Sequence, residues 1–207
     1  MEKYIIVVFI SYLMGSIHFS FLLGRYKRHV DIREHGSKNS GAANALIVFG
    51  PKIGVMTATV DVLKGTFAVM IIRHLYPDDS FIATLSALVV VLGHMYPFYM
   101  KFRGGKGLAT SIGVTLGISF YWALAMFITL IVFTLLTDYI AVGTGMTEVC
   151  GFTLIAINYG ISAESLCYLI LASLIIAKHI PNYVKIYRKE EFHFLDTVRP
   201  KKGKDTE

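Results

Sequence analysis

The sequence predicts an all-α integral membrane protein, a single bundle of about seven transmembrane helices with its active-site loops on the cytoplasmic side. Two features of composition support this prediction: 55% of the 207 residues are hydrophobic and only 16% are charged, against about 25% charged residues in an average soluble domain. The third is that apolar residues recur in runs, several of them long enough to cross about 30 Å of hydrocarbon as a helix. The alternating pattern of a transmembrane β-barrel is absent from the sequence.

The predicted spans follow one another along the chain. The first is Tyr4 to Leu23, and because it begins almost at Met1 without a small-residue cleavage site, we expect it to be retained rather than removed as a signal peptide. The second runs from about Ile53 to Ile72, and the third is the shorter run from Phe81 to Leu92. The next apolar run, Leu108 to Leu136, is too long for one ordinary span and short for two.

Basic side chains gather in three regions that flank the apolar runs, and the formal net charge is +6. By the positive-inside rule, these three regions are predicted to be cytoplasmic. Because each region abuts a span and faces anionic lipid, we expect membrane lipids, and no nucleic acid, as partners. The regions hold Arg25, Lys27, Arg28, Arg33, Lys38 and Lys52 after the first run; Lys101, Arg103 and Lys106 before the long apolar run; and Lys178, Lys185, Arg188, Lys189, Arg199, Lys201, Lys202 and Lys204 in a basic tail, residues 178–207.

If the three basic regions all lie on the cytoplasmic side, the number of membrane crossings is restricted. The chain after Lys106 must then cross the membrane an even number of times before it reaches the tail. With the three spans before Lys106, two further crossings give five spans in total and four give seven. Seven spans require Leu108 to Leu136 to divide near Ser119 to Trp122, followed by Ile140 to Ile157 and Leu166 to Ala177. We favour seven in one membrane-embedded domain, residues 1–207, with the N-terminus outside and the C-terminus cytoplasmic; five is the alternative.

A glycine-rich stretch from Gly93 to Thr110 interrupts the apolar runs. Its centre precedes a predicted helix, where backbone N–H groups, the positive helix end and an ammonium group can hold a phosphate. The same residues can instead form only a tight turn between helices. His94 could orient or protonate a phosphate oxygen, or could be a helix-end histidine bonded to a carbonyl. The glycine-rich motif consists of Gly104, Gly105, Lys106 and Gly107.

The loop from Arg25 to Pro51 is the longest polar connection before the tail, and loops of this length are often functional. It is rich in small, hydroxyl and amide residues, which form turns and anion-binding nests, and an arginine there can grip a phosphate with two N–H groups. The alternative is an ordinary polar loop capped by asparagines. The candidate binding residues of this loop are Arg33, Gly36, Ser37, Asn39, Gly41 and Asn44.

Polar residues also occur inside the predicted spans or at their ends. Asp61 and Lys64 lie one turn apart in the second span and can form an ion pair. Ionisable residues within a span are a functional signal, although this pair could also only neutralise itself at a helix contact. His179 and Asn182 lie three residues apart at the end of the last apolar run, where they could act together or simply decorate the helix end.

Several kinds of chemistry find no support in the sequence. Cys150 and Cys167 both fall in apolar segments without metal-ligand spacing, so we expect them to pack. The chain has no Gly-x-Ser-x-Gly, no His-Glu-x-x-His and no complete Walker sequence. We therefore predict neither a covalent serine, nor a bound metal, nor a cofactor.

With these residues in view, the chain resembles the bacterial acyl-phosphate-dependent glycerol-3-phosphate acyltransferases over nearly its whole length. The most specific match is to the family pattern Gly-His-x-x-Pro-x-x-x-x-Phe-x-Gly-Gly-Lys-Gly-x-Ala-Thr. It is met at Gly93, His94, Pro97, Phe102, Gly104, Gly105, Lys106, Gly107, Ala109 and Thr110. The first-loop pattern is met at Gly15, Ser16, Asp31, Arg33, Gly36, Ser37, Asn39, Gly41, Ala42 and Asn44, and Asp61, Lys64 and Gly65 also have counterparts.

The resemblance implies transfer of a fatty acyl group from acyl phosphate to glycerol 3-phosphate, giving lysophosphatidic acid and phosphate, at the bacterial inner membrane. Under this hypothesis the glycine-rich motif and Thr110 bind one phosphate, and the first loop binds the other phosphate or the glycerol hydroxyls. His179 and Asn182 would position the attacking hydroxyl or stabilise the developing oxyanion. The catalytic candidates are Ser37, Asn39, His179 and Asn182, and Lys64 and His94 join the phosphate-binding candidates named above.

The chain also departs from the family pattern. His18 stands where the family usually has proline, Lys38 where it has glycine and Ala43 where it has threonine. The match weakens toward the C-terminus, at Asp138, Ala141, Ile180, Tyr183 and Lys189 to Glu191. Two alternatives therefore stand beside the enzyme: a membrane transporter of anions or phospholipids, and a non-catalytic lipid-binding paralogue.

Overall fold

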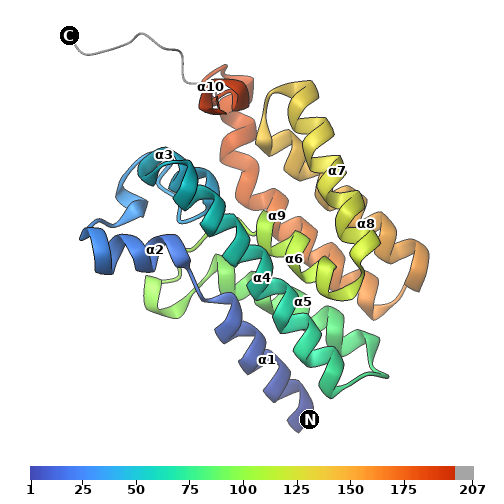
Figure 1. Cartoon of the computed structure of the whole chain (residues 1–207). Coiled ribbons are helices and arrows are strands. Elements are labelled where there is room, and N and C mark those ends of the chain that lie inside the picture. Colours follow the sequence, from blue (N-terminus) through green and yellow to red (C-terminus); the bar gives the residue numbers. More distant parts are fainter. Residues whose placement is uncertain (199–207) are drawn as a thin grey trace, which may run out of the picture.

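The computed structural model describes residues 1–198, and in that part of the chain the regular structure is entirely helical. The N-terminus and the last described helix, Phe194–Val198, lie at opposite ends of the helix bundle (Figure 1). Arg199, Lys201, Lys202 and Lys204 of the predicted basic tail lie outside the described residues. The α-helices are α1 Glu2–Gly15, α2 Phe19–Leu23, α3 Ala42–Phe49, α4 Pro51–Leu75, α5 Ser80–Met95, α6 Leu108–Ile118, α7 Phe120–Thr137, α8 Ile140–Tyr159, α9 Ala163–Tyr187 and α10 Phe194–Val198, with a π-helical turn at Gly24–Arg28 and 3-10 turns at Ile32–Glu34 and Phe98–Met100.

Five stretches among the described residues are long and apolar enough to cross a membrane, and a sixth is possible if the bent pair at the N-terminus counts as one span. The five are α4, α5 with the turn that follows it, α7, α8 and α9. The predicted division of the long apolar run is confirmed, because α6 ends at Ile118 and α7 begins at Phe120. With 11 residues, α6 is about 16 Å long, too short to span the hydrocarbon alone.

The first predicted span is broken, which corrects the expectation of one continuous helix. The axis bends by 50° between α1 and the helical segment that starts at Phe19. The carbonyl oxygens at the break are nevertheless paired: that of Ser16 accepts from the Tyr99 hydroxyl at 2.7 Å, and that of Ile17 accepts from the Lys64 ammonium at 2.7 Å. Irregular backbone at membrane depth is tolerated only where protein groups pair it in this way.

Two segments expected to be loop or tail are helical instead. The first polar loop contains α3, whose residues are mostly apolar and favour a helix. The last helix does not end near Ala177 but continues to Tyr187, with Pro181 inside it. The first third of the predicted tail, residues 178–187, is therefore the end of α9, and its side chains are held on a rigid helical face.

Most of the buried apolar side chains form one core between α4, α5, α6, α7, α8 and α9. Cys167 belongs to this core and Cys150 packs against it, as predicted. Glycines let α4 and α6 approach backbone to backbone: a Cβ at Gly113 would lie 2.1 Å from the carbonyl oxygen of Val62, and one at Gly65 would lie 2.7 Å from that of Thr110. Small residues at such contacts are the usual basis of close helix packing in membranes.

This contact predicts that Gly113→Ala destabilises the protein although alanine is the better helix former. The added methyl would overlap backbone, and such overpacking is expected to lower stability by about 1–3 kcal/mol. The midpoint of thermal unfolding in detergent checks this, with Thr153→Ala on the exposed face of α8 as the control. A Gly113→Ala protein as stable as the parent would contradict the close approach.

Candidate active site

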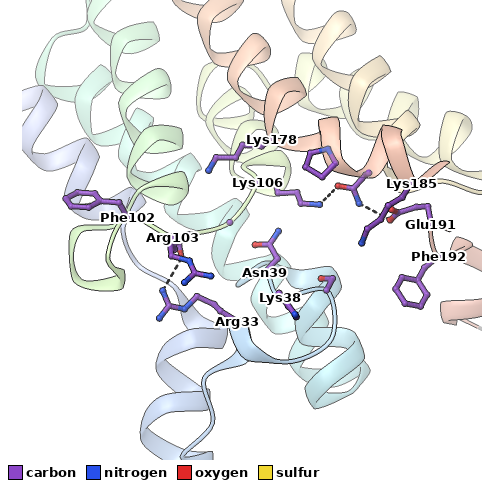
Figure 2. Close-up of a pocket in the computed structure, with 15 residues that line it drawn as sticks. Arg33, Lys38, Asn39, Phe102, Arg103, Lys106, Lys178, Lys185, Glu191 and Phe192 are labelled. Atoms are coloured by element: carbon purple, nitrogen blue, oxygen red, sulfur yellow. Dashed lines mark hydrogen bonds between the residues drawn. The ribbon is translucent and has the colours of Figure 1, made fainter. Parts of the chain in front are cut away.

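A cavity of about 340 Å³ opens among three segments: the first loop, the glycine-rich stretch after α5, and the end of α9 with the residues that follow it (Figure 2). Its volume is within the usual range for small-molecule sites. Six cationic side chains line it, against the single carboxylate of Glu191. The cations are Arg33, Lys38, Arg103, Lys106, Lys178 and Lys185. Such an excess of positive charge suits a phosphorylated anion.

Lys106 lies at the centre of this charge. Its ammonium donates to Asn182 Oδ1, and Asn182 Nδ2 donates in turn to Glu191 Oε1 at 2.8 Å (Figure 2). Burial lowers the pKa of Lys106 from its ordinary value, with the nearby Glu191 opposing that effect and Lys185 adding to it. The positive charge of Lys106 is therefore lost at a lower pH than that of an exposed lysine.

The first loop is built around Asn44, which is 1% exposed. Its Nδ2 lies within 2.6 to 3.1 Å of three carbonyl oxygens of the loop, and its Oδ1 accepts from the backbone N–H of Ser37 at 2.7 Å. Gly36 has φ of +57°, and a Cβ there would lie 2.3 Å from Asn44 Oδ1. Asn44 and Gly36 thus fix the conformation of the first loop without lining the cavity.

Asn39, in contrast, faces the cavity. Its Oδ1 is buried and has no hydrogen-bond partner among residues 1–198. A buried acceptor without a partner is costly, so it is a position where a ligand's donor would be favourable. Figure 2 places the Asn39 side chain on the first loop, directed toward the space that Lys106 enters from the other side.

Arg33 lines the cavity, but most of its N–H groups are already used. Nε and one terminal nitrogen grip the Asp31 carboxylate at 3.0 and 2.7 Å, and the other terminal nitrogen donates to the carbonyl of Met100 at 2.6 Å. The Arg33 guanidinium lowers the pKa of Asp31, and Asp31 raises that of Arg33. Arg33 therefore joins the first loop to the segment after α5, and the Asp31 carboxylate offsets its charge.

Some backbone N–H groups of the glycine-rich motif are also already hydrogen-bonded within the protein. The N–H groups of Gly104 and Gly105 donate to the carbonyls of Met95 and His94, both at 3.0 Å. This corrects the expectation that all four residues of the motif offer N–H groups to a phosphate. Gly107, with φ of +99°, is the N-cap of α6, as the predicted helix start requires. The remaining backbone donors of the motif are those of Lys106 and Gly107.

Lys64 and His94 lie beneath this motif rather than on the cavity wall. The Lys64 ammonium is 2.8 Å from Asp61 Oδ1, 2.7 Å from the Ile17 carbonyl and 2.8 Å from His94 Nδ1. The first of these contacts is an ion pair and the other two are hydrogen bonds. Because an ammonium can only donate, His94 Nδ1 is an acceptor. His94 is then neutral, with its proton on Nε2. A Cβ at Gly105 would lie 2.0 Å from that Nε2, so only glycine fits over the ring.

The structure thus brings together about half of the sequence-predicted site residues. Those that line the cavity are Arg33, Ser37, Asn39, Gly104, Gly105, Lys106 and Asn182. Those that do not are Gly36, Gly41, Asn44, Lys64, His94, Gly107, Thr110 and His179. Among the second group, His179 is 5% exposed and its Nδ1 lies 2.9 Å from the carbonyl of Ile175, whereas Thr110 Oγ1 is buried without a partner among the described residues.

Several cavity residues were not among the predicted site residues. Lys178 and Lys185 reach the cavity from the same face of α9 as Asn182. The spacing i, i+4, i+7 places these three side chains on one face of the helix. This spacing is the sequence pattern from which Lys178 and Lys185 could be predicted as site residues. Phe102 and Phe192, 60% and 67% exposed, add an apolar rim.

Comparison with known proteins agrees with this arrangement. A family model described as glycerol-3-phosphate acyltransferase matches residues 5–189, which is most of the chain. The chain belongs to the glycerol-3-phosphate acyltransferase family. One curated member, the glycerol-3-phosphate acyltransferase of Thermoanaerobacter pseudethanolicus, is 39% identical over 185 residues, which cover 88% of this chain and 91% of the relative.

Two solved structures of the acyltransferase family share the fold. One is the crystal structure of PlsY (YgiH), an integral membrane glycerol 3-phosphate acyltransferase, in its glycerol 3-phosphate form. It aligns with a TM-score of 0.87 at 30% identity over 95% of this chain and 98% of that chain. The lysophosphatidic acid form of the same protein aligns with a TM-score of 0.84 at 29% identity over 94% and 98% of the two chains.

The buried ion pair gives a prediction for this acyltransferase family member. Lys64→Met leaves the Asp61 carboxylate buried without its partner, which is expected to lower the free energy of unfolding by about 3–5 kcal/mol. The double variant Asp61→Asn/Lys64→Met removes both charges and should recover most of that loss. Unfolding in detergent measures both, with Lys52→Met at the exposed start of α4 as the control. A double variant as unstable as Lys64→Met would contradict this account of the pair.

Proposed function

We propose that this chain transfers a fatty acyl group from acyl phosphate to glycerol 3-phosphate, giving lysophosphatidic acid and inorganic phosphate. The observation that supports this most strongly is the cavity itself, where six cations surround the unpartnered acceptor of Asn39. Both proposed substrates are phosphorylated anions that repel one another, and cationic groups offset that repulsion. The fit to family members named for glycerol 3-phosphate is the second support.

Glycerol 3-phosphate binds across the cavity in this proposal. Its phosphate replaces Asn182 as the partner of Lys106 and receives the N–H groups of Lys106 and Gly107. Its hydroxyl donates to Asn39 Oδ1, which satisfies the buried acceptor. Thr110, whose Oγ1 also lacks a partner among the described residues, lies in the first turn of α6 behind this phosphate position and stays a candidate ligand.

Acyl phosphate occupies the other half of the cavity. Arg103, Lys38 and the remaining N–H of Arg33 face its phosphate, and the apolar rim of Phe102 and Phe192 admits the acyl chain from the lipid. The glycerol hydroxyl attacks the acyl carbonyl carbon, the bond from that carbon to the phosphate oxygen breaks, and phosphate leaves with the hydroxyl proton. Because the donor is already activated, orientation and charge neutralisation are the protein's main contribution.

The catalytic candidates take separate roles in this scheme. Ser37 and Asn39 orient the attacking hydroxyl from the first loop. Asn182, once Lys106 has turned to the phosphate, offers its amide to the developing oxyanion or the hydroxyl. His179 lies one turn before Asn182 on α9 and supports it from the buried side.

We further propose that the chain crosses the bacterial inner membrane seven times, with the N-terminus outside and the cavity cytoplasmic. The broken first span and the short α6 are then both crossings, completed by tilt and by the segments that flank them. The support for this side is the concentration of cations around the cavity, which follows the positive-inside rule.

Turnover by the purified protein tests the proposal. We expect lysophosphatidic acid and phosphate in equal amounts from palmitoyl phosphate and glycerol 3-phosphate in liposomes, and no product with acyl-CoA or acyl carrier protein as donor. Product from the thioesters alone would contradict the donor assignment. Movement of glycerol 3-phosphate into the liposomes without product would favour a transporter instead.

Removing the charge of Lys106 should remove the activity without unfolding the protein. Lys106→Gln loses the central cation of the cavity, and we expect kcat/KM for glycerol 3-phosphate to fall about 100-fold or more. Steady-state kinetics measure the effect, and the thermal midpoint shows whether the fold is retained. Lys101→Gln, an exposed lysine of the same stretch that does not line the cavity, is the matched control. Full activity in Lys106→Gln or Lys106→Glu would contradict the assignment.

A further inference from the structure

His18 is a buried histidine at the break between α1 and α2, and it belongs to neither wall of the cavity. Its side chain is 1% exposed. The ring stacks on that of His94, with 4.6 Å between the ring centroids and 29° between the planes. A histidine buried this deeply needs a hydrogen-bond partner for each nitrogen.

Both ring nitrogens of His18 have such partners, which lie in two different segments of the chain. Nε2 lies 2.9 Å from the carbonyl oxygen of His94, which can only accept, so the proton is on Nε2. Nδ1 lies 3.3 Å from the Ser40 hydroxyl, which can either donate or accept. His18 is therefore a hydrogen-bonded link between two segments that are distant in the sequence.

Each partner of His18 is next to a cavity segment. Ser40 is fully buried, directly follows Asn39, and has its carbonyl held by the Ser20 hydroxyl at 2.6 Å. The His94 carbonyl that accepts from His18 also accepts from the N–H of Gly105, which directly precedes Lys106. The His18 imidazole is thus hydrogen-bonded to Ser40, the neighbour of Asn39, and to the carbonyl that holds Gly105, the neighbour of Lys106.

We propose that His18 is a positioning residue that sets the separation between Asn39 and Lys106, and so the fit of glycerol 3-phosphate between them. This inference rests on the proposed function, in which these two residues hold opposite ends of that substrate. Displacement of a binding group by about 1 Å can lower the rate of an enzyme about 100-fold.

Three substitutions at this position separate the two hydrogen bonds. His18→Phe keeps an aromatic ring against His94 but removes both bonds. His18→Asn places an amide near the position of Nδ1 and keeps the bond to Ser40, whereas His18→Gln reaches the position of Nε2 and keeps the bond to the His94 carbonyl. The matched control is Ser40→Ala, which removes only the hydroxyl partner.

The experiment measures KM for glycerol 3-phosphate and for palmitoyl phosphate, kcat and the thermal midpoint for each variant. We expect His18→Phe to raise KM for glycerol 3-phosphate about 10-fold while KM for palmitoyl phosphate changes less than about 2-fold. His18→Asn and His18→Gln should lie between His18→Phe and the parent, and Ser40→Ala should match His18→Gln. A purely structural role would lower the amount of active enzyme, and hence the apparent kcat, without a selective change in KM.

Two results would overturn the inference: unchanged KM values in His18→Phe, or equal rises in KM for both substrates. If His18→Phe does not fold, KM values for glycerol 3-phosphate equal to the parent's in both His18→Asn and His18→Gln would overturn it as well. An inactive parent protein, by contrast, is a failure of the proposed function, which the parent's own turnover reveals before any variant is compared.

Discussion

The buried Lys64 ammonium is the constraint on which the rest of the structure depends. Inside the helix bundle it forms an ion pair with the Asp61 carboxylate and hydrogen bonds to the Ile17 carbonyl and His94 Nδ1. These acceptors lie on α4, at the break of the first span and on α5, so one cation fixes three segments relative to one another. A buried ion pair adds little net stability compared with an apolar contact, but removing one partner is severe. We infer that the pair is retained for the position that it imposes.

This network is connected to the cavity through His94 at the end of α5. The carbonyls at the end of α5 accept from the N–H groups of Gly104 and Gly105, which places Lys106 on the cavity wall with its ammonium on Asn182. The first loop is shaped by Asn44 and places Asn39 on the wall of the same cavity, where its buried Oδ1 has no partner among residues 1–198. The cavity therefore combines a rigid frame with groups that need a ligand, which is the preorganisation that charge-driven acyl transfer requires.

Local sequence patterns predicted the elements whose causes are local. The end of α6 near Ser119, the helix start at Gly107 and the ion pair of Asp61 with Lys64 all follow from neighbours within a few residues. The break at Ser16 to His18 could not be predicted in that way, because its carbonyls are satisfied by side chains 47 and 83 residues away. The site was predicted only in outline. The glycines and the lysine of the motif identify an anion-binding loop from local sequence. Which polar residues face the cavity and which support it from behind depends on the packing of distant segments.

In the function proposed above, a fixed polar interior holds Asn39 and Lys106 at the two ends of one substrate. The most direct test is a crystal structure of this protein with glycerol 3-phosphate bound. We expect the phosphate on the Lys106 ammonium, a glycerol hydroxyl on Asn39 Oδ1, and an unchanged Asp61–Lys64–His94 network beneath them. A phosphate bound elsewhere, with Lys106 still donating to Asn182 and Asn39 Oδ1 still without a partner, would contradict it.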